Sequence, residues 1–399
     1  MYVARRSERT LGDLAAQFPV VVITGPRQSG KTTLVRQFFP NYSYVSLEDP
    51  DNREFAEQDP RGFLDRFEHG VILDEVQRVP DLVSYLQGIV DERGDPGQFI
   101  LSGSQQFGLM EQVTQSLAGR AAVLDLLPFS LDELQADGLV PQDLDRLLFT
   151  GLYPPIYDRG IDPPTFYANY VRNYIERAVR QMVNVRDLTT FQRFLRLCAG
   201  RNGQMLNLSQ LGSDAGITHN TAKAWLSVLE ASYIVHLVPA HHRNFNKRVI
   251  KTPKLHFIDP GLCSWLLGIE KADQISTHPL RGPLFESYIA SELLKRRYDG
   301  GKQSNLHYWR GRGGLEVDLV IERPEGLDPV EVKAGATIAG DWFGSLRRWM
   351  ELAGESAGRP FLIYGGDQML ERSGVRVLPW HQASLVLGPG EAHLPAPLG

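Results

Sequence analysis

The chain has 399 residues, 42% hydrophobic and 22% charged, which is typical of a globular protein of about two to four domains. The formal net charge of −5 excludes a surface coated with basic residues but allows a local basic patch. Cys198 and Cys263 stand far apart and outside any metal-binding motif, as expected in a reducing cytoplasm without disulfides. We find no signal peptide and no apolar run near the ~20 residues of a membrane helix, so we expect a cytoplasmic protein with no membrane partner.

A glycine-rich loop follows the first predicted strand, the apolar run 20–23. Residues 25–32 read GPRQSGKT and match the phosphate-loop pattern G-x-x-x-x-G-K-[ST]. Glycines let such a loop turn its N–H groups inward, and the helix expected behind it favours phosphate at its N-terminus. Lys31 can reach the β- and γ-phosphates, and Thr32 can bind Mg²⁺. We therefore predict that ATP contacts Gly25, Pro26, Arg27, Gln28, Ser29, Gly30, Lys31, Thr32 and Thr33.

The rest of the N-terminal third predicts a parallel sheet. After a helix at 8–17, strands are expected at 44–47, 71–75, 98–104 and 121–126. Strands that alternate with helices indicate a sheet covered on both faces, with ligands at the carboxyl ends of its strands. The strand 71–75 ends in two carboxylates. Asp74 can hold Mg²⁺ together with Thr32, and Glu75 can orient or deprotonate the attacking water.

Two further candidates in this part each have an alternative. The strand 98–104 is expected between the strands of the phosphate loop and of Asp74, which would bring Ser104 or another polar side chain near the γ-phosphate. Alternatively, its serines only begin a loop. Arg120 could reach the γ-phosphate of a neighbouring subunit as an arginine finger. Alternatively, it forms a surface ion pair.

Four segments together resemble a known family: GPRQSGKTTL, VILDEVQRVPDL, FILSGSQQF and LAGRAAVLDLLPFS. They are similar to the AAA+ ATPases of one large bacterial and archaeal family, whose members carry a C-terminal region of formally unknown function. The resemblance covers nearly the whole chain. It implies a five-stranded AAA+ P-loop core with the phosphate-loop strand central, and homo-oligomers, by analogy hexamers, in which one subunit completes its neighbour's site. The family commonly has Asp after YIER, where this chain has Ala178, so no role is carried over there.

The chain is predicted to divide into an AAA+ ATPase core at 1–135, a helical lid or linker at 136–200, a winged helix-turn-helix at 201–275 and an α/β nuclease-like domain at 276–399. Apolar residues at helical spacing run from 166 to 197. Proline and glycine mark 128–160 as the passage out of the first sheet. The stretch 378–399, which contains several prolines and glycines, is expected to end on the surface.

The helix-turn-helix is predicted from a helix at 208–215, a turn at Gly216 and a second helix capped by Thr218. A hairpin of 233–238 against 255–258 would form the wing, and its connection 243–254 holds five basic and no acidic residues. Such modules read DNA with the start of the second helix and hold phosphates with basic side chains. Alternatively, the module binds a protein and its basic loop is simply solvated. The residues predicted to contact duplex or branched DNA are His219, Asn220, Thr221, Lys223, Arg243, Lys247, Arg248 and Lys251, and those predicted to face the core are Ala222, Trp225, Leu226 and Leu229.

A second metal site is predicted in the C-terminal third. Glu286 lies in a helical run, Asp318 in a strand, and Glu331 and Lys333 on one face of the next strand. If the two strands are neighbours, the three carboxylates can share Mg²⁺ with Lys333 beside the attacking water, as phosphodiester hydrolysis requires. The order Glu, Asp, Glu-x-Lys resembles the PD-(D/E)XK nuclease superfamily. Alternatively, the region keeps these residues but only binds DNA or supports assembly.

These patterns predict an ATP- and Mg²⁺-dependent AAA+ machine that acts on DNA, such as a translocase or a junction-migration motor, with nuclease activity as an addition. The alternative is a nucleotide-gated signalling or scaffold protein whose winged helix binds another protein. A small-molecule kinase is disfavoured, because no acceptor-site features accompany the phosphate loop.

Overall fold

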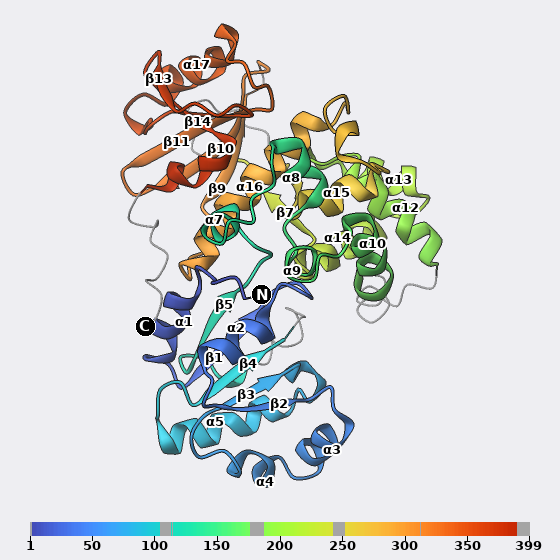
Figure 1. Cartoon of the computed structure of the whole chain (residues 1–399), viewed down its shortest axis with the longest axis vertical. Coiled ribbons are helices and arrows are strands. Elements are labelled where there is room, and N and C mark those ends of the chain that lie inside the picture. The colour runs from blue at the N-terminus through green and yellow to red at the C-terminus, as the bar shows by residue number, and fades with distance from the viewer. Residues whose placement is uncertain are drawn as a thin grey trace. The chain divides into compact units, whose positions relative to one another are not determined.

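The computed structural model describes residues 2–103, 113, 115–175, 187–241, 252–311 and 313–388 (Figure 1). The chain divides into two compact units, one built mainly from Met1–Phe129 with Arg297–Lys302, the other from Ser130–Arg296 with Gln303–Ala392. The second unit joins the regions expected to be lid, winged helix and nuclease-like domain, and the four-part division stays a prediction. Within the described ranges, no helix combines the length and apolar character needed to cross a bilayer.

The first unit is built on five parallel strands in the order β2-β3-β4-β1-β5. The predicted parallel α/β core is therefore confirmed, and β4 lies between β3 and β1 as expected. The implied central position of the phosphate-loop strand is wrong, because β4 lies in the middle and only β5 lies outside β1. The strands are β1 (Val20–Thr24), β2 (Ser43–Ser46), β3 (Val71–Asp74), β4 (Phe99–Ser102) and β5 (Ala121–Asp125).

Helices cover both faces of this sheet, which is why β1, β3 and β4 are buried along their whole length. Val21 and Ile23 of β1 pack with residues of α1 and α2, whereas Val20 and Val22 pack with residues of α3, α4 and α5. The elements are α1 (Glu8–Ala15), α2 (Lys31–Phe38), α3 (Pro50–Gln58), α4 (Pro60–Asp65), the 3-10 turn η1 (Val76–Arg78) and α5 (Leu82–Arg93).

The second unit begins with helices. A capping box starts α7, since the side chains of Ser130 and Glu133 bond each other's backbone N–H. The apolar period of 166–197 corresponds to α10, a π-helical turn and α12, with 176–186 outside the described residues. The helices are α7 (Leu131–Ala136), α8 (Leu144–Thr150), α9 (Pro154–Asp158), α10 (Pro163–Tyr170), η2 (Val171–Ile175), α12 (Leu188–Ala199), α15 (Pro260–Leu266), η3 (Ala272–Gln274) and α16 (Arg281–Asp299).

The predicted pair of helices is present as α13 (Leu208–Ala215) and α14 (His219–Ala231). Gly216 has φ 78°, a left-handed conformation that suits glycine, and Thr218 caps α14 by accepting a bond from the N–H of Thr221. A three-stranded sheet follows in the order β6-β8-β7, with β6 (Gln204–Met205), β7 (Val235–Val238) and β8 (Lys254–Phe257). The four residues predicted to face the core, Ala222, Trp225, Leu226 and Leu229, are buried. The assignment of these elements as a winged helix stays a prediction.

A six-stranded mixed sheet, ordered β13-β14-β12-β11-β10-β9, forms the C-terminal part. Its β10 and β11 are antiparallel neighbours, and α17 packs on both with Trp349 fully buried. A second α/β region is therefore present, and its nuclease-like character stays a prediction. The elements are β9 (Leu306–Arg310), β10 (Glu316–Arg323), β11 (Gly326–Lys333), η4 (Gly340–Phe343), α17 (Gly344–Ala353), η5 (Gly354–Ser356), β12 (Phe361–Tyr364), β13 (Leu370–Arg372), β14 (Val375–Pro379) and η6 (Trp380–Leu387).

The expectation that 378–399 ends on the surface is wrong for its first ten residues. Leu378 lies in β14 and is fully buried, and Trp380 and Val386 of η6 are also buried. Their large apolar side chains explain this burial, because the prolines and glycines that suggested a surface tail lie mostly beyond residue 388.

Candidate active sites

The phosphate loop lies between the carboxyl end of β1 and the N-terminus of α2. Gly25 has φ 143°, and a Cβ there would lie 2.1 Å from the carbonyl oxygen of Leu126. Gln28 and Gly30 also have positive φ, 62° and 95°. Such turns direct successive backbone N–H groups inward, which is the arrangement that binds an anion. Of the predicted ATP contacts, Gly25, Pro26, Ser29 and Lys31 are buried, Arg27, Gln28, Gly30 and Thr32 half-buried, and Thr33 exposed.

The ammonium of Lys31 is held inside this loop. Its Nζ donates hydrogen bonds to the carbonyl oxygens of Gly25 (2.9 Å) and Pro26 (2.8 Å). Burial lowers the pKa of Lys31 to about 8, although the carboxylates of Glu75 and Asp74 raise it. The Lys31 ammonium is therefore bonded to two neutral carbonyl oxygens, and an anion bound in the loop would attract it more strongly.

Asp74, at the carboxyl end of β3, accepts hydrogen bonds from three hydroxyl groups. Its Oδ2 accepts hydrogen bonds from the hydroxyls of Thr32 and Tyr44, both at 2.8 Å, and its Oδ1 accepts from Ser102. Burial and the Asp74 carboxylate raise the pKa of Tyr44 to about 12, so its phenol stays a donor. The strand order explains the convergence, because β2, β3 and β4 are neighbours and all end at this edge.

Glu75 follows in a left-handed conformation, φ 55°, which turns its side chain away from the strand direction. Its Oε2 accepts a hydrogen bond from Gln77 and lies 3.8 Å from the Arg27 guanidinium of the phosphate loop. The Glu75 carboxylate thus lies beside the phosphate loop.

A residue that the sequence did not single out is Arg5. Its guanidinium is buried and donates to the carbonyl oxygens of Ser29 and Leu127, each at 2.7 Å, with the Phe129 ring centroid 5.0 Å away. Because the Ser29 carbonyl is held by Arg5, the phosphate loop is tied to the segment that follows β5. No motif marks an arginine for this role, and only the tertiary contact reveals it.

Arg120, another candidate of the first unit, is not brought to this edge. Arg120 lies at the start of β5, whereas the loop lies at the strands' carboxyl ends, and its Nε and Nη2 bond Asp91 at 2.5 and 2.9 Å. Arg120 thus forms the surface ion pair that was expected if it is not an arginine finger. Its predicted contact with a neighbouring subunit stays a prediction. Ser104 lies outside the described residues, while Ser102 of the same segment does reach Asp74.

At the predicted DNA-binding helix, His219, Asn220 and Lys223 are exposed and Thr221 is half-buried at the start of α14. Arg243, Lys247, Arg248 and Lys251 lie outside the described residues. Lys254, counted with them as part of a basic wing, is buried in the second unit. That part of the wing prediction is wrong, since a buried lysine is not available to a phosphate.

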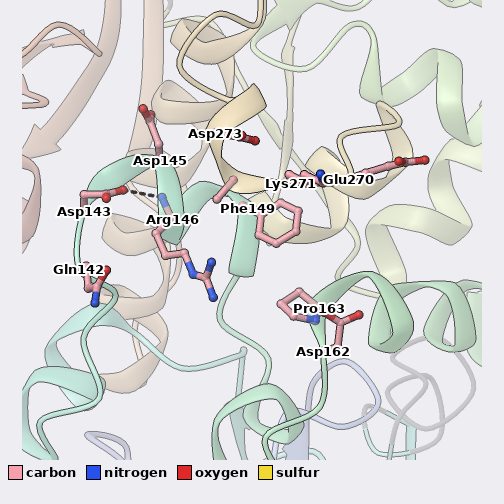
Figure 2. Close-up of a pocket in the computed structure, with 11 residues that line it drawn as sticks. Gln142, Asp143, Asp145, Arg146, Phe149, Asp162, Pro163, Glu270, Lys271 and Asp273 are labelled. Carbon is pink, nitrogen blue, oxygen red and sulfur yellow. Dashed lines mark hydrogen bonds between the residues drawn. The ribbon is translucent and has the colours of Figure 1, made fainter.

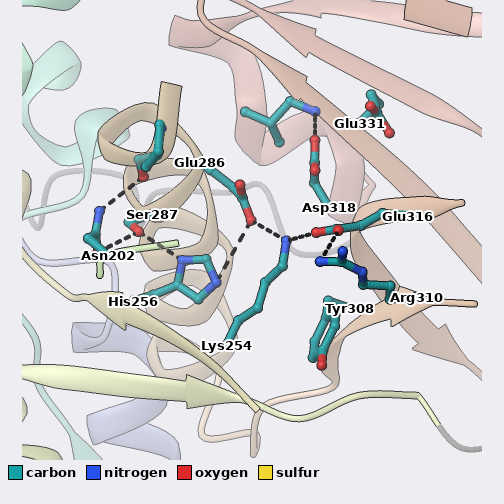
Figure 3. Close-up of polar contacts among 12 residues, drawn as sticks. Asn202, Lys254, His256, Glu286, Ser287, Tyr308, Arg310, Glu316, Asp318 and Glu331 are labelled. Atoms are coloured by element: carbon teal, nitrogen blue, oxygen red, sulfur yellow. Dashed lines mark hydrogen bonds and ion pairs between the residues drawn. The ribbon is translucent and has the colours of Figure 1, made fainter. Parts of the chain in front are cut away.

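The acidic residues of the second unit do converge (Figure 3). Asp318 of β10 accepts a hydrogen bond of 2.9 Å from the N–H of Val332, and Lys333 Nζ lies 3.6 Å from Asp318 and 2.5 Å from Glu331. Burial and the Asp318 carboxylate raise the pKa of Glu331, and Lys333 opposes this rise. In the part of the chain that is described, no group of three or more His, Cys, Asp or Glu side chains is placed to hold a metal ion. The predicted magnesium site of Glu286, Asp318 and Glu331 therefore stays a prediction.

Three residues that the sequence did not assign to this site complete the cluster. Lys254 Nζ lies 2.9 Å from Glu286 and 2.6 Å from Glu316, and Arg310 lies 3.1 Å from the other oxygen of Glu316 (Figure 3). Glu316 could have been found, because it stands two positions before Asp318 and so shares its face of the strand. Lys254 could not, since the sequence gives no sign that β8 lies against α16 and β10.

An open pocket of about 660 Å³ lies elsewhere in the second unit (Figure 2). Three of its five carboxylates already have structural roles. Asp143 and Asp162 cap α8 and α10, and Asp145 forms an ion pair of 2.7 Å with Arg281. We assign no ligand to this pocket.

Comparisons with known proteins support a nucleotide-binding domain around the phosphate loop. Residues 17–135 match the model of an AAA domain, which covers the phosphate loop, Asp74 and Arg120. Residues 141–273 and 281–383 match two domains of unknown function, DUF8612 and DUF4143. The first unit thus contains an AAA-type P-loop ATPase domain.

Two curated relatives are the uncharacterized proteins Mb2031c of Mycobacterium bovis and Rv2008c of Mycobacterium tuberculosis. Each is 28% identical over 327 residues, which cover 78% of this chain and 70% of the relative. Among solved structures, the Walker-type ATPase paby2304 of Pyrococcus abyssi shares 15% identity at a TM-score of 0.42, covering 65% of this chain and 94% of that one. The RuvB Holliday junction branch migration motor of Thermotoga maritima shares 16% at 0.31, covering 59% and 90%. Scores this low carry no weight for function.

Proposed function

We propose that this protein is an ATP-driven machine that acts on DNA, as a translocase or a remodeller of branched junctions. The observation that carries the ATPase part is the hydrogen bond from Thr32 to Asp74 beside the phosphate loop. These two oxygen ligands are the hard donors that Mg²⁺ prefers, and the inward N–H groups fit a triphosphate. Lys31 would contact the β- and γ-phosphates, and Glu75 would orient the attacking water.

Bound Mg²⁺ would neutralise charge that develops on the phosphates. The other roles in ATP hydrolysis belong to residues of the chain itself. Lys31 exchanges loop carbonyls for phosphate oxygens, Tyr44 and Ser102 hold Asp74 in place, and Glu75 accepts a hydrogen bond from water. Loss of ATP hydrolysis in Lys31→Ala, in protein that stays folded, tests this assignment. Full turnover in that variant would overturn it.

The DNA part rests on the exposed start of α14 and on the composition of 243–251. We propose contacts from His219, Asn220, Thr221 and Lys223 together with Arg243, Lys247, Arg248 and Lys251. ATPase rates and gel shifts on single-stranded, duplex and branched DNA over a salt series test this, because phosphate contacts weaken steeply with salt. Rates that no nucleic acid stimulates, and no binding at low salt, would contradict the proposal.

We also propose a homo-oligomer, by analogy a hexamer, in which Arg120 reaches a neighbour's nucleotide, and Mg²⁺-dependent cleavage by Glu286, Asp318, Glu331 and Lys333. Light scattering with and without an ATP analogue tests the assembly. Asp318→Ala should remove Mg²⁺-dependent cleavage and leave ATP hydrolysis unchanged. Cleavage at the wild-type rate in that variant would refute the site.

One observation favours the competing function, a nucleotide-gated signalling or scaffold protein. Lys254, counted with the basic wing, is in fact buried among carboxylates, so the described part of that region is less basic than its composition suggests. A protein partner captured by the exposed face of α14, combined with no DNA binding at low salt, would decide for this alternative.

A further inference from the structure

The ammonium of Lys254 lies between carboxylates, where proteins also bind metal cations. It lies between two carboxylates from different elements, 2.9 Å from Glu286 of α16 and 2.6 Å from Glu316 of β10, and its side chain is only 3% exposed (Figure 3). The ring of Tyr308, with its centroid 5.3 Å from Nζ, adds a further attraction for a cation. Two carboxylates and one aromatic face therefore lie around the Lys254 ammonium.

A second observation concerns the carboxylate of Glu331. Glu331 is 5% exposed, and its Oε1 accepts from Lys333. Its Oε2 is buried and has no hydrogen-bond partner among the described residues. A buried carboxylate oxygen without a donor is costly, and a cation would stabilise it. Asp318 belongs to the same group, because the Lys333 ammonium lies 3.6 Å from Asp318 and 2.5 Å from Glu331.

The neighbouring histidine does not supply this charge. His256 Nε2 lies 4.0 Å from Glu286, farther away than the Lys254 ammonium at 2.9 Å. Its Nδ1 is instead engaged with the hydroxyl of Ser287 at 2.8 Å. Lys254 is thus the cation that partners Glu286.

We propose that Lys254 is the built-in counter-ion of this acidic site, and that a divalent cation enters only in exchange for its ammonium, with Glu316 as an added ligand. This rests on the proposed nuclease-like site and adds a residue that controls its access to metal. A carboxylate pair that holds an ammonium at 2.6 to 2.9 Å can hold a small divalent ion after that ammonium leaves, because oxygen ligands suit both.

Metal binding without nucleotide or DNA tests the proposal. In Lys254→Met the side chain keeps its approximate length but loses the charge, and we expect one additional Mn²⁺ site per chain, bound at least about tenfold more tightly than by the wild type in titration calorimetry. Lys271→Met, which alters an exposed lysine outside the cluster, should match the wild type. Adding Glu331→Gln to Lys254→Met should remove the gained Mn²⁺ affinity. That loss would assign the additional Mn²⁺ site to this cluster.

Loss of Lys254 leaves the carboxylate of Glu286 without its ammonium partner, which can destabilise the fold. If Lys254→Met is destabilised, Mn²⁺ should raise its melting temperature more than that of the wild type, because the ion then replaces the lost positive charge. Wild-type protein that binds Mn²⁺ as tightly as Lys254→Met would overturn the role of the lysine and leave the metal site intact. Failure of every variant to bind Mn²⁺ would overturn both the inference and the proposed nuclease site, without bearing on ATP hydrolysis.

Discussion

The hydroxyl of Thr32, the second residue of α2, donates a hydrogen bond of 2.8 Å to the carboxylate of Asp74 at the end of β3. The two residues are 42 positions apart, and they meet because β4 is the only strand between β1 and β3. This contact joins the residue predicted to bind Mg²⁺ from the loop with the one predicted to hold it from the sheet.

Asp74→Asn should lower the rate of ATP hydrolysis by about a hundredfold or more, since an amide is a poorer ligand for Mg²⁺ and loses the charge. ATP affinity should change much less, because the loop N–H groups and Lys31 remain. Steady-state kinetics and nucleotide titrations measure the two effects separately. Unchanged turnover, in a variant with an unchanged melting temperature, would exclude Asp74 from the chemistry.

ATP affinity should fall as the pH rises above about 8, the value to which burial lowers the pKa of Lys31. A bound triphosphate raises that pKa again, so the complex holds a proton that the free protein has lost at high pH. The affinity then falls by up to about tenfold per pH unit until the pKa of the complex is reached. Nucleotide titrations from about pH 7 to about pH 10 measure this. In Lys31→Arg, whose side chain stays charged, any remaining affinity should not show the decrease; the same decrease in that variant would assign it to another group.

Arg5→Ala should destabilise the first unit by about 1–3 kcal/mol for each carbonyl left without its donor, those of Ser29 and Leu127. It should also weaken ATP binding, since the Ser29 carbonyl is then free to rotate and the loop loses its preformed shape. Arg5→Lys keeps the charge but cannot hold both oxygens in a fork. Its stability and ATP affinity should therefore lie between those of the wild type and those of Arg5→Ala. Thermal unfolding and nucleotide titration check this, with Arg9→Ala, at an exposed arginine of α1, as the control. Normal ATP affinity in Arg5→Ala would leave the residue with a purely structural role.

Lys223→Ala should weaken DNA binding and reduce the salt dependence of log K by about one unit, as expected when one phosphate contact is lost. Because Lys223 is exposed on α14, the melting temperature should stay the same. Fluorescence anisotropy with duplex and branched DNA at several salt concentrations provides the measurement. Lys271→Ala serves as the control for loss of an exposed positive charge. Equal affinities and salt slopes for wild type and Lys223→Ala would remove the start of α14 from the DNA interface.

The sequence by itself determined those features that depend on neighbouring residues. Gly25 and Gly30 are needed for left-handed turns, Thr218 caps α14, and Gly216 ends α13, all through contacts that span a few positions. Strand 71–74 could be recognised for the same reason, because a strand buried on both faces is a short apolar run with a polar end.

Only the tertiary structure decided which distant groups meet. Tyr44 and Ser102 reach Asp74 through the strand order, Arg5 reaches the phosphate loop from the segment before α1, and Lys254 turns from a presumed wing residue into the partner of Glu286. Residues so far apart along the chain leave no pattern in the spacing of the sequence. Their contacts depend on how strands and helices pack, so the charge of Lys254 could be counted from the sequence but its partners could not.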